Sequence, residues 1–248
     1  MKAIITDLDR TLLRTDKTIS EHTLSVLKAC REKGIPVMAA TARPERSISI
    51  YRNQVGFQAA ATLNGAKILL PSGVIENGIS FASAEIILRK IVGIPGIKIS
   101  LETEKGIFSN MENPEWNPVV YKGFPGLPEC KQIYKLLLNS PENDLRQAVK
   151  QSITEDVYFT IADEVLVQIM DKKATKWNGI KAMLGAMGLS PEDAVYFGDD
   201  NDDIEPVSNC GVGIAVSNAI DEVLAAADYV TAANDLDGVA QWIEKHLL

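Results

Sequence analysis

Two aspartates, one residue apart, follow the first apolar segment of the chain in the stretch MKAIITDLDRTLL. The apolar residues 3–5 are typical of a strand that is covered on both faces of a sheet. Side chains at positions i and i+2 of an extended chain point the same way, so Asp7 and Asp9 could lie side by side just past this strand. Open α/β sheets bind their ligands at that edge. The alternative is that Asp9 and Thr11 only accept hydrogen bonds from backbone amides in a loop.

A second acidic turn, GDDNDD at residues 198–203, follows a second apolar run, AVYF. Two parallel strands that both end in acids could bring three or four carboxylates together at one edge of a sheet. A set of ligands made only of oxygen atoms suits Mg²⁺. The sequence therefore predicts a magnesium site formed by carboxylates of the two acidic turns, and a solvated acidic loop is the alternative.

A calcium-binding EF-hand loop is a rival interpretation of the second turn. Asp199, Asn201 and Asp203 fit the first three ligand positions of such a loop. The sixth position, however, is Ile204 instead of glycine, and the twelfth is Cys210 instead of glutamate. The EF-hand interpretation therefore fails.

Two further side chains could bind an anion near this edge. Thr41 ends the strand-like run IPVMAAT and begins a helix, where a hydroxyl group and free amides suit a phosphate oxygen, although the residue could also be a simple N-cap. Lys176 lies at the start of another helix, where a lone lysine is most often solvated. Two common nucleotide-binding motifs are missing from the sequence. The run GVGIAV has Val216 where the dinucleotide-binding fingerprint needs glycine or alanine, and no segment matches the phosphate-binding loop GxxxxGK[ST].

Strand-like and helix-like runs alternate around these residues, as in a parallel sheet with right-handed crossovers. Ser20 is expected to cap the first helix, and Asn64-Gly65 to form a turn between two apolar halves of a strand-like run. The helix that begins near Lys176 carries a stripe of apolar residues that includes Met183, and such a stripe is far more often core than binding surface.

The pattern changes to that of an α+β domain from about residue 82. Residues 129–138 and 142–151 are helix-like, and DVYFTIA and EVLVQIMD could pair as a hairpin around Asp163 and Glu164. The fold class expected is therefore α/β, a Rossmann-like core with a parallel sheet plus an inserted α+β domain. The expected domains are a discontinuous core, residues 1–81 and 174–248, and the insertion, residues 82–173.

Composition limits the classes of function. The chain has 248 residues, 46% of them hydrophobic and 23% charged, which is ordinary for a globular protein. A net charge of −8 is a poor balance for binding nucleic acid, and an anionic small substrate would need local help from a cation. Three widely spaced cysteines indicate neither disulfides nor a zinc cluster. Without a signal peptide or a long apolar run, a cytoplasmic location is expected.

In this order, DLDRTLL, ATARP, LNGAKI, the lysine of ATKWNGIKAML and FGDDNDDIEPV resemble the motifs of the haloacid dehalogenase superfamily, and the closing IAVSNAIDEVLAAADYVTAANDLDGVAQWIEKHL does as well. The chain is most similar to the Cof-type hydrolases of subfamily IIB, which have a C2-type cap domain. The resemblance covers residues 1–80 and 174–248, and the segment between them matches by its position and its element pattern.

The resemblance implies a role for each acid. Asp7 would be the nucleophile that forms an aspartyl-phosphate, and Asp9 would protonate the leaving group and then activate water. True dehalogenases lack that second acid, so phosphoryl transfer is favoured. The metal, Mg²⁺, would be bound by a carboxylate oxygen of Asp7, the backbone carbonyl of Asp9 and the carboxylate of Asp199, with Asp203 close by or acting through water.

The resemblance also implies substrate contacts. Thr41 and Lys176 would bind phosphate oxygens and stabilise the transition state. Arg43 and Asn64 would contact the substrate. Asp202 takes the place of the asparagine in the family's usual GDxxND motif, with an asparagine one place earlier. Arg10 stands where the family usually has glycine, and its side chain could reach toward the cap or the substrate, or be accommodated by a shifted loop.

The function that the resemblance implies is hydrolysis of phosphoric monoesters by a Mg²⁺-dependent phosphatase. Its substrate would be a small phosphorylated metabolite such as a sugar phosphate. The alternatives are a phosphomutase of the same superfamily and a protein that binds a phosphorylated ligand without catalysis. No nucleic-acid or membrane partner is expected, and the protein is expected to be a monomer or a weak homodimer.

Overall fold

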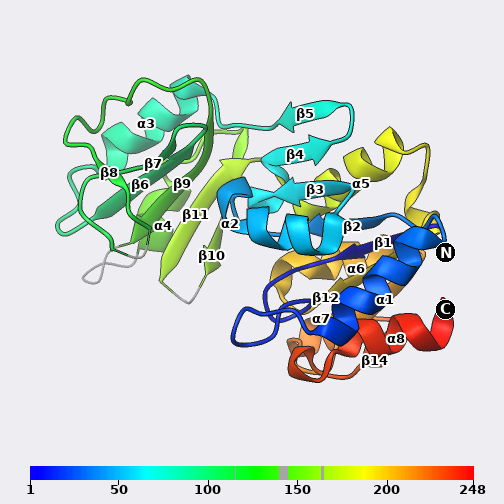
Figure 1. The fold of residues 1–248 in the computed structure, drawn as a ribbon. Helices are drawn as coiled ribbons and strands as arrows, with labels where there is room; N and C mark the ends of the chain where they lie inside the picture. Colours follow the sequence, from blue (N-terminus) through cyan, green and yellow to red (C-terminus); the bar gives the residue numbers. More distant parts are fainter. Residues whose placement is uncertain (115, 140–144, 163–164) are drawn as a thin grey trace. The chain divides into compact units, whose positions relative to one another are not determined.

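The computed structural model describes residues 1–114, 116–139, 145–162 and 165–248. The chain divides into two compact units, one of Met1–Ile75 with Thr175–Leu248 and the other of Glu76–Ala174 (Figure 1). The units therefore separate at residues 75/76 and 174/175, whereas the sequence predicted domain boundaries at 81/82 and 173/174. Residues just after position 75 belong with the second unit because the amide of Ile79 donates to the carbonyl of Ile133, 2.7 Å away.

The sheet of the first unit has the strand order β14-β13-β12-β1-β2-β3-β4-β5. Neighbouring strands from β14 to β3 pair in parallel, and β3 and β4 form an antiparallel hairpin. The turn predicted at Asn64-Gly65 connects the two strands of this hairpin. The strands are β1 (Ala3–Thr6), β2 (Val37–Ala40), β3 (Ala59–Thr62), β4 (Lys67–Leu70), β5 (Gly73–Glu76), β12 (Ala194–Gly198), β13 (Val212–Val216) and β14 (Tyr229–Thr231).

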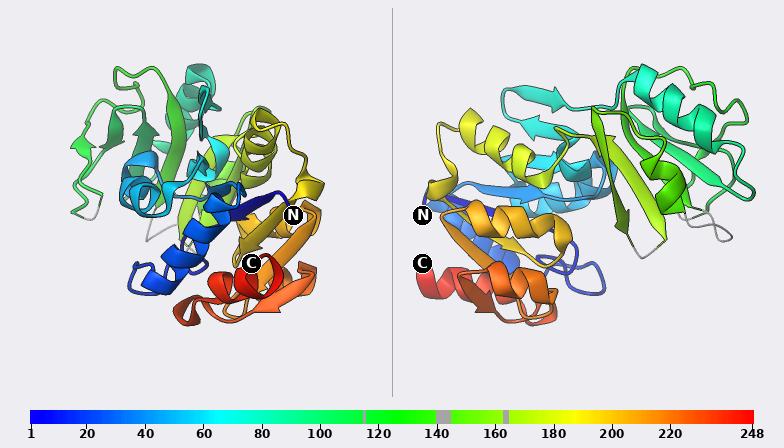
Figure 2. Two further views of the ribbon diagram at one scale, coloured as in Figure 1. Left: turned by 45° about the vertical axis from the view of Figure 1, so that its right-hand side comes forward. Right: turned by 180° about the vertical axis from the view of Figure 1, so that it is seen from behind.

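Helices cover both faces of this sheet (Figure 2). Ile4 on one face belongs to an apolar core with α1 and α8, which lie side by side, and Ile5 on the other face belongs to a core with α5. Burial on both faces explains why these strands are continuously apolar. Met183 is fully buried in the second core, as predicted. The helices are α1 (Glu21–Glu32), α2 (Glu45–Tyr51), α5 (Lys176–Ala186), α6 (Ile204–Asn209), α7 (Asp221–Ala226) and α8 (Gly238–His246).

Short helical turns complete the first unit. Ser20 caps α1, because its hydroxyl group accepts a hydrogen bond from the amide of Thr23 at 3.0 Å, as predicted. A π-helical turn extends α2, and 3₁₀ turns lie next to several strands and helices. These turns span Arg52–Gly56 (π), Leu63–Gly65, Pro191–Asp193, Asn201–Asp203 and Asn234–Leu236.

The second unit is an α+β domain, as predicted. Its sheet has the order β10-β11-β9-β6-β7-β8 and is antiparallel except where β7 pairs with β8. Two helices pack on one face of the sheet, where Leu88 and Val149 join its apolar core. The elements are α3 (Phe81–Ile91), β6 (Lys98–Thr103), β7 (Gly106–Ser109), β8 (Val119–Val120), β9 (Ile133–Asn139), α4 (Leu145–Lys150), β10 (Val157–Ala162) and β11 (Leu166–Asp171).

One predicted element of the second unit is wrong. Residues 129–138 do not form a helix, because β9 begins at Ile133 and pairs with both β6 and β11. The helix predicted at 142–151 corresponds to α4, and its first three residues lie outside the described part of the chain. The hairpin of β10 and β11 is confirmed, although Asp163 and Glu164 are also outside the described residues. None of the helices in the described ranges is both long and apolar enough to span a membrane.

Candidate active site

Three of the predicted site residues lie just past the carboxyl ends of neighbouring parallel strands. Asp7 follows β1, Asp199 follows β12 and Thr41 follows β2. The amide of Asp7 continues the pairing of β1, because it donates to the carbonyl of Phe197 in β12 at 2.9 Å. Register between parallel strands therefore brings residues from distant parts of the sequence to one edge of the sheet, where such folds bind ligands.

A buried chain of charges begins at Asp7. The ammonium group of Lys176 donates to Oδ1 of Asp7 at 2.8 Å and to Oδ1 of Asp203 at 2.6 Å. The three residues are 5%, 5% and 0% exposed respectively. Burial alone would lower the pKa of Lys176, but the carboxylates of Asp203 and Asp7 raise it above its ordinary value. Lys176 is therefore a buried cation and not the solvated lysine of the alternative interpretation.

The N-terminus of α5 fixes the position of Lys176. The hydroxyl group of Thr175 caps the helix by accepting a hydrogen bond from the amide of Asn178 at 3.1 Å. Gly65 packs against this helix end with φ +87°, and a Cβ atom there would lie 2.4 Å from the carbonyl oxygen of Thr175. A glycine is therefore needed both for the backbone conformation and for the close approach.

Asp199 lies beside this chain of charges. Its Oδ1 accepts a hydrogen bond from the hydroxyl group of Thr11 at 2.5 Å. Burial raises the pKa of Asp199 to about 6, and the negative charge of Asp203 contributes to the rise, while the Thr11 hydrogen bond opposes it. Thr11 does not act as a backbone cap, contrary to the alternative considered from the sequence.

The carboxylates fit a divalent cation. One carboxylate oxygen from each of Asp7, Asp199 and Asp203 lies within 4.8 Å of the other two. Burial raises the pKa of Asp7 well above its ordinary value, and the charges of Asp203 and Asp199 add to this effect against the opposing charge of Lys176. A buried cluster of oxygen ligands with an excess of negative charge suits a hard cation such as Mg²⁺.

Asp9 lies in a different environment from Asp7. Its carboxylate accepts two hydrogen bonds from the guanidinium group of Arg43, at 2.6 and 2.7 Å, and one from the ammonium group of Lys17 at 2.8 Å. Partial burial would raise the pKa of Asp9, but these hydrogen bonds lower it overall. Asp9 is therefore held as a carboxylate by two cations, and a backbone amide is not its partner.

Thr41 does not cap α2. The N-cap position belongs to Pro44, and the hydroxyl group of Thr41 instead accepts a hydrogen bond from the amide of Arg43 at 3.2 Å. The carbonyl of Thr41 accepts from the amide of Asn64 at 3.0 Å, which ties the β3–β4 turn to the site. The side-chain amide of Asn64 donates to the carboxylate of Asp202. Oδ1 of Asn64 is buried and has no hydrogen-bond partner in the described ranges.

Arg10 adopts the left-handed conformation, with φ 59°, in which a glycine would be unstrained. Its guanidinium group donates to the carbonyl of Asn218 at 3.3 Å, and its Nε lies 4.0 Å from Oδ2 of Asp199. The side-chain amide of Asn218 donates back to the carbonyl of Arg10 at 2.8 Å. These contacts accommodate the arginine within the first unit.

Three residues of the site were not predicted from the sequence as site residues. Thr11 and Lys17 contact Asp199 and Asp9, and Tyr196 contacts Asp203. The position of Thr11, two residues after Asp9, was a signal for a hydroxyl group near the acids. Lys17 lies in a polar loop and Tyr196 in an apolar strand, where such residues are ordinary, so the sequence carried no signal for either.

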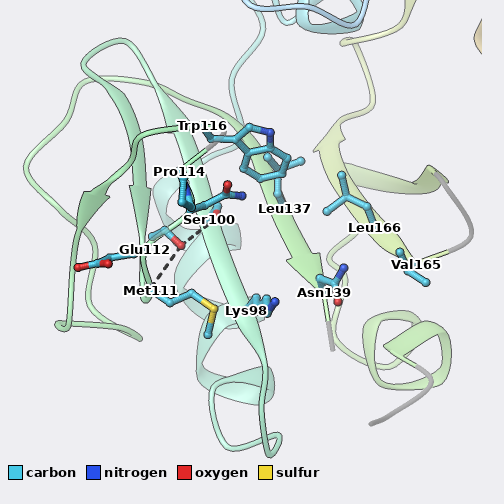
Figure 3. A pocket seen from close by; sticks show the side chains of 12 residues that line it. Lys98, Ser100, Met111, Glu112, Pro114, Trp116, Leu137, Asn139, Val165 and Leu166 are labelled. Atoms are coloured by element: carbon cyan, nitrogen blue, oxygen red, sulfur yellow. Dashed lines mark hydrogen bonds between the residues drawn. The ribbon is translucent and has the colours of Figure 1, made fainter. Parts of the chain in front are cut away.

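A pocket of about 410 Å³ lies in the second unit (Figure 3). Lys98 and Ser100 line it from β6, and Leu137 and Asn139 line it from β9. These positions alternate along the strands with the residues that face α3 and α4, so the pocket is on the opposite face of the sheet. Trp116 adds an aromatic wall, and the mixture of polar and apolar side chains suits a small organic group.

The fold gathers buried acids and a buried lysine at the carboxyl edge of a parallel sheet, where proteins of this class bind their ligands. Residues 4–243 match the family described as haloacid dehalogenase-like hydrolase. The chain belongs to this family, and the resemblance seen in its motifs is confirmed.

Known relatives extend over nearly the whole chain. The 5-amino-6-(5-phospho-D-ribitylamino)uracil phosphatase YitU of Bacillus subtilis is 26% identical over 98% of this chain and 96% of its own length. The phosphoglycolate phosphatase of Methanothermobacter thermautotrophicus is 27% identical over 100% of this chain and 99% of its own length. The crystal structure of TM0651 from Thermotoga maritima shares the fold, with a TM-score of 0.87 and 24% identity over 100% of this chain and 98% of that one.

Proposed function

We propose that the protein is a Mg²⁺-dependent phosphatase that hydrolyses a small phosphorylated metabolite, such as a sugar phosphate, through an aspartyl-phosphate. The observation that carries the proposal is the buried arrangement of Asp7, Lys176 and Asp199, with Asp9 two residues after Asp7. The curated relatives named above are phosphatases of phosphorylated small molecules, which supports the same class of substrate.

In the proposed first step, a carboxylate oxygen of Asp7 attacks the phosphorus atom and the bond to the leaving alkoxide breaks. Lys176 and Thr41 would bind the phosphate oxygens, and Lys176 would exchange part of its contact with Asp7 for the substrate. Asp9 would give its proton to the leaving alkoxide. Because Arg43 and Lys17 hold Asp9 as a carboxylate in this structure, one of these contacts must loosen when Asp9 takes up that proton.

In the proposed second step, water hydrolyses the aspartyl-phosphate. The carboxylate form of Asp9 takes a proton from the attacking water, and orthophosphate leaves as Asp7 is regenerated. Asp7, Asp199 and the backbone carbonyl of Asp9 would hold Mg²⁺, with Asp203 next to them. When bound, the cation supplies positive charge that lets the anionic nucleophile approach the anionic phosphate.

The second unit has a proposed role in substrate choice. It is inserted between β5 and α5 in the chain, at the place where the resemblance implies a cap domain. Its pocket combines an ammonium group, hydroxyl groups and an indole, and we propose that side chains of this unit select the organic part of the substrate.

The test is release of orthophosphate from p-nitrophenyl phosphate and from a panel of sugar phosphates, measured with Mg²⁺ and with a chelator. Asp7→Asn is expected to lower kcat by about 10³-fold or more, because the nucleophile is lost while its shape is kept. Asp221→Asn makes the same chemical change at an exposed position in α7 and should leave kcat unaltered. A wild-type protein that releases no orthophosphate from any of these esters, or that only isomerises them, contradicts the proposal.

A further inference from the structure

Tyr196 is a buried polar side chain that the proposed mechanism does not use. It lies in β12, three residues before Asp199, and is 0% exposed. Its ring belongs to the apolar core between the sheet and α5, but its hydroxyl group donates to Oδ1 of Asp203 at 2.5 Å. Burial raises the pKa of Tyr196 well above its ordinary value, and the negative charge of Asp203 adds to this effect, so the phenol keeps its proton.

The two oxygens of Asp203 are both fully engaged. Oδ1 accepts from Tyr196 at 2.5 Å and from Lys176 at 2.6 Å. Oδ2 accepts from the backbone amides of Asp199 and Asp200 at 3.0 and 3.1 Å. An ionised carboxylate has about four acceptor sites, so these four donors fill them. The protein itself therefore fixes the orientation of Asp203.

This arrangement connects the phenol to the reaction centre through two hydrogen bonds. Tyr196 and Lys176 share one oxygen of Asp203, and Lys176 also donates to the nucleophile Asp7 at 2.8 Å. Without the phenol, that oxygen would have the ammonium group as its remaining donor, and the carboxylate could turn about the hydrogen bonds of its other oxygen. Lys176 would then follow the carboxylate and leave its position against Asp7 and a bound phosphate.

We propose that Tyr196 is a positioning residue for the phosphatase reaction. Its hydroxyl group orients the carboxylate of Asp203, and Asp203 in turn holds the ammonium group of Lys176 against Asp7. Tyr196 does not touch the substrate. The inference rests on the proposed function, because Lys176 must act on the phosphate for its position to affect the rate.

Tyr196→Phe tests the proposal, because it removes the hydroxyl oxygen and keeps the ring in the core. Tyr134→Phe is the matched control. Tyr134 is also a buried strand tyrosine, 2% exposed, and its hydroxyl group donates to a carboxylate, that of Glu76, in the second unit. Tyr196→Phe loses a buried hydrogen bond to a carboxylate, and Tyr134→Phe loses a partly buried one, because Glu76 is exposed. Thermal stability should therefore fall in both variants, and less in Tyr134→Phe.

Kinetics should separate the two variants. Tyr196→Phe is expected to lower kcat about tenfold, with KM and the half-saturating Mg²⁺ concentration changed less than twofold, because a misplaced ammonium group weakens transition-state binding. Tyr134→Phe should keep the wild-type kcat. An equal kcat in wild type and Tyr196→Phe, or an equal fall of kcat in both variants, overturns the proposal.

A second measurement does not depend on catalysis. In the metal-free protein, the ¹⁵N resonance of the Lys176 ammonium group, assigned by its loss in Lys176→Met, should shift in Tyr196→Phe and stay in place in Tyr134→Phe. An unchanged resonance in Tyr196→Phe overturns the inference. Absence of orthophosphate release by the wild-type protein would instead overturn the proposed function, and the resonance would still show whether the phenol positions Lys176.

Discussion

Asp199 differs in its surroundings from the other acids of the site. Asp7 and Asp203 contact the ammonium group of Lys176, and Asp9 contacts two cations. Asp199 instead accepts a hydrogen bond from the neutral hydroxyl group of Thr11, while the exposed Arg10 lies at the longer distance of 4.0 Å from it. Burial raises the pKa of Asp199 to about 6. A carboxyl group with a raised pKa binds a proton more strongly in the folded chain than in the unfolded chain. A bound cation would compete with that proton for the carboxylate.

The stability of the metal-free protein should therefore depend on pH through Asp199. The folded pKa, about 6, lies above the ordinary value of 3.8, so this contribution is complete below pH 3.8 and is lost as the pH rises through 6. Between pH 5 and pH 7.5 the loss amounts to about 1 kcal/mol of the free energy of unfolding. Urea unfolding in a chelator at both values measures it.

The matched comparison is Asp199→Asn, which has no proton to lose. Its free energy of unfolding should fall about 1 kcal/mol less than that of the wild type over the same pH range. Groups far from Asp199 titrate alike in both proteins and cancel in the difference. The pKa of Asp7 should be raised less in Asp199→Asn, because the charge of Asp199 contributes to it. Equal pH dependence in the two proteins would show that burial does not raise the pKa of Asp199.

The gathering of the acids could be predicted from the sequence, but their hydrogen bonds could not. Asp7 and Asp199 each follow an apolar strand, and the parallel pattern brings the ends of such strands to one edge. Donors to a carboxylate depend instead on side-chain directions in three dimensions, and Lys17 and Tyr196 look ordinary in a polar loop and an apolar strand. The catalytic and metal-binding roles assigned to these residues stay predictions.

The helix α5 is the element that joins the site to the sheet. Its first residue, Lys176, contacts the carboxylates of Asp7 and Asp203, while Gly179, one turn later, faces β3. A Cβ atom on Gly179 would lie 2.6 Å from the Cβ atom of Ala61, which is closer than side chains approach one another. The absence of a side chain at this position therefore lets the helix lie close enough to the sheet for Lys176 to reach Asp7.

Two glycine substitutions in this helix should have opposite effects. Gly179→Ala is expected to lower the free energy of unfolding by about 1–3 kcal/mol, because the helix must shift away from Ala61. Gly185→Ala, near the other end of the helix, meets no atom within 4 Å and should raise stability by about 0.5–1 kcal/mol. Urea unfolding and orthophosphate release measure both variants.

The two glycine variants should also differ in activity. Gly179→Ala should also lower kcat, because Lys176 moves with the helix, whereas Gly185→Ala should keep it. If Gly179→Ala is as active and as stable as the wild type, close packing of α5 on β3 does not position Lys176.

Most helices and strands could be predicted from the sequence, but β9 was wrongly predicted as a helix. In the run KQIYKLLLN, the spacing of Ile133, Leu136 and Leu137 fits one face of a helix, and leucine and lysine favour helices. The structure instead places β9 between β6 and β11, with hydrogen-bonding partners on both sides. Pairing with distant strands outweighed the local preference of the chain, and such partners cannot be seen in a local pattern.

The cluster of Asp7, Lys176, Asp199 and Asp203 belongs to the first of two compact units. A ligand that binds this cluster should therefore stabilise the first unit selectively. Mg²⁺ at 100 times its dissociation constant should add about 2.7 kcal/mol to the free energy of unfolding of the part that binds it. Hydrogen exchange measured by mass spectrometry, with Mg²⁺ or with a chelator, can assign this effect to residues. Added protection is expected in residues 1–75 and 175–248, and little change in 76–114, 116–139, 145–162 and 165–174.

Asp199→Asn should remove most of this added protection, because one of the carboxylates that would bind the cation is lost. Asp221→Asn, on the exposed start of α7, should leave the protection in place. Equal gains in both units, or full protection in Asp199→Asn, would contradict a cation site formed by Asp7 and Asp199 next to Asp203.

The order of the strands determines when the nascent chain can complete the sheet of the first unit during translation. Lys176 and Asp7 are 169 residues apart in the sequence, and β1 lies between β2 and β12, which is synthesised long after it. The second unit is continuous in the sequence and can fold as soon as it has emerged, because domains generally fold as units. Asp7 therefore meets Lys176, Asp199 and Asp203 only late in translation. A truncated product of interrupted synthesis lacks this cluster of charges.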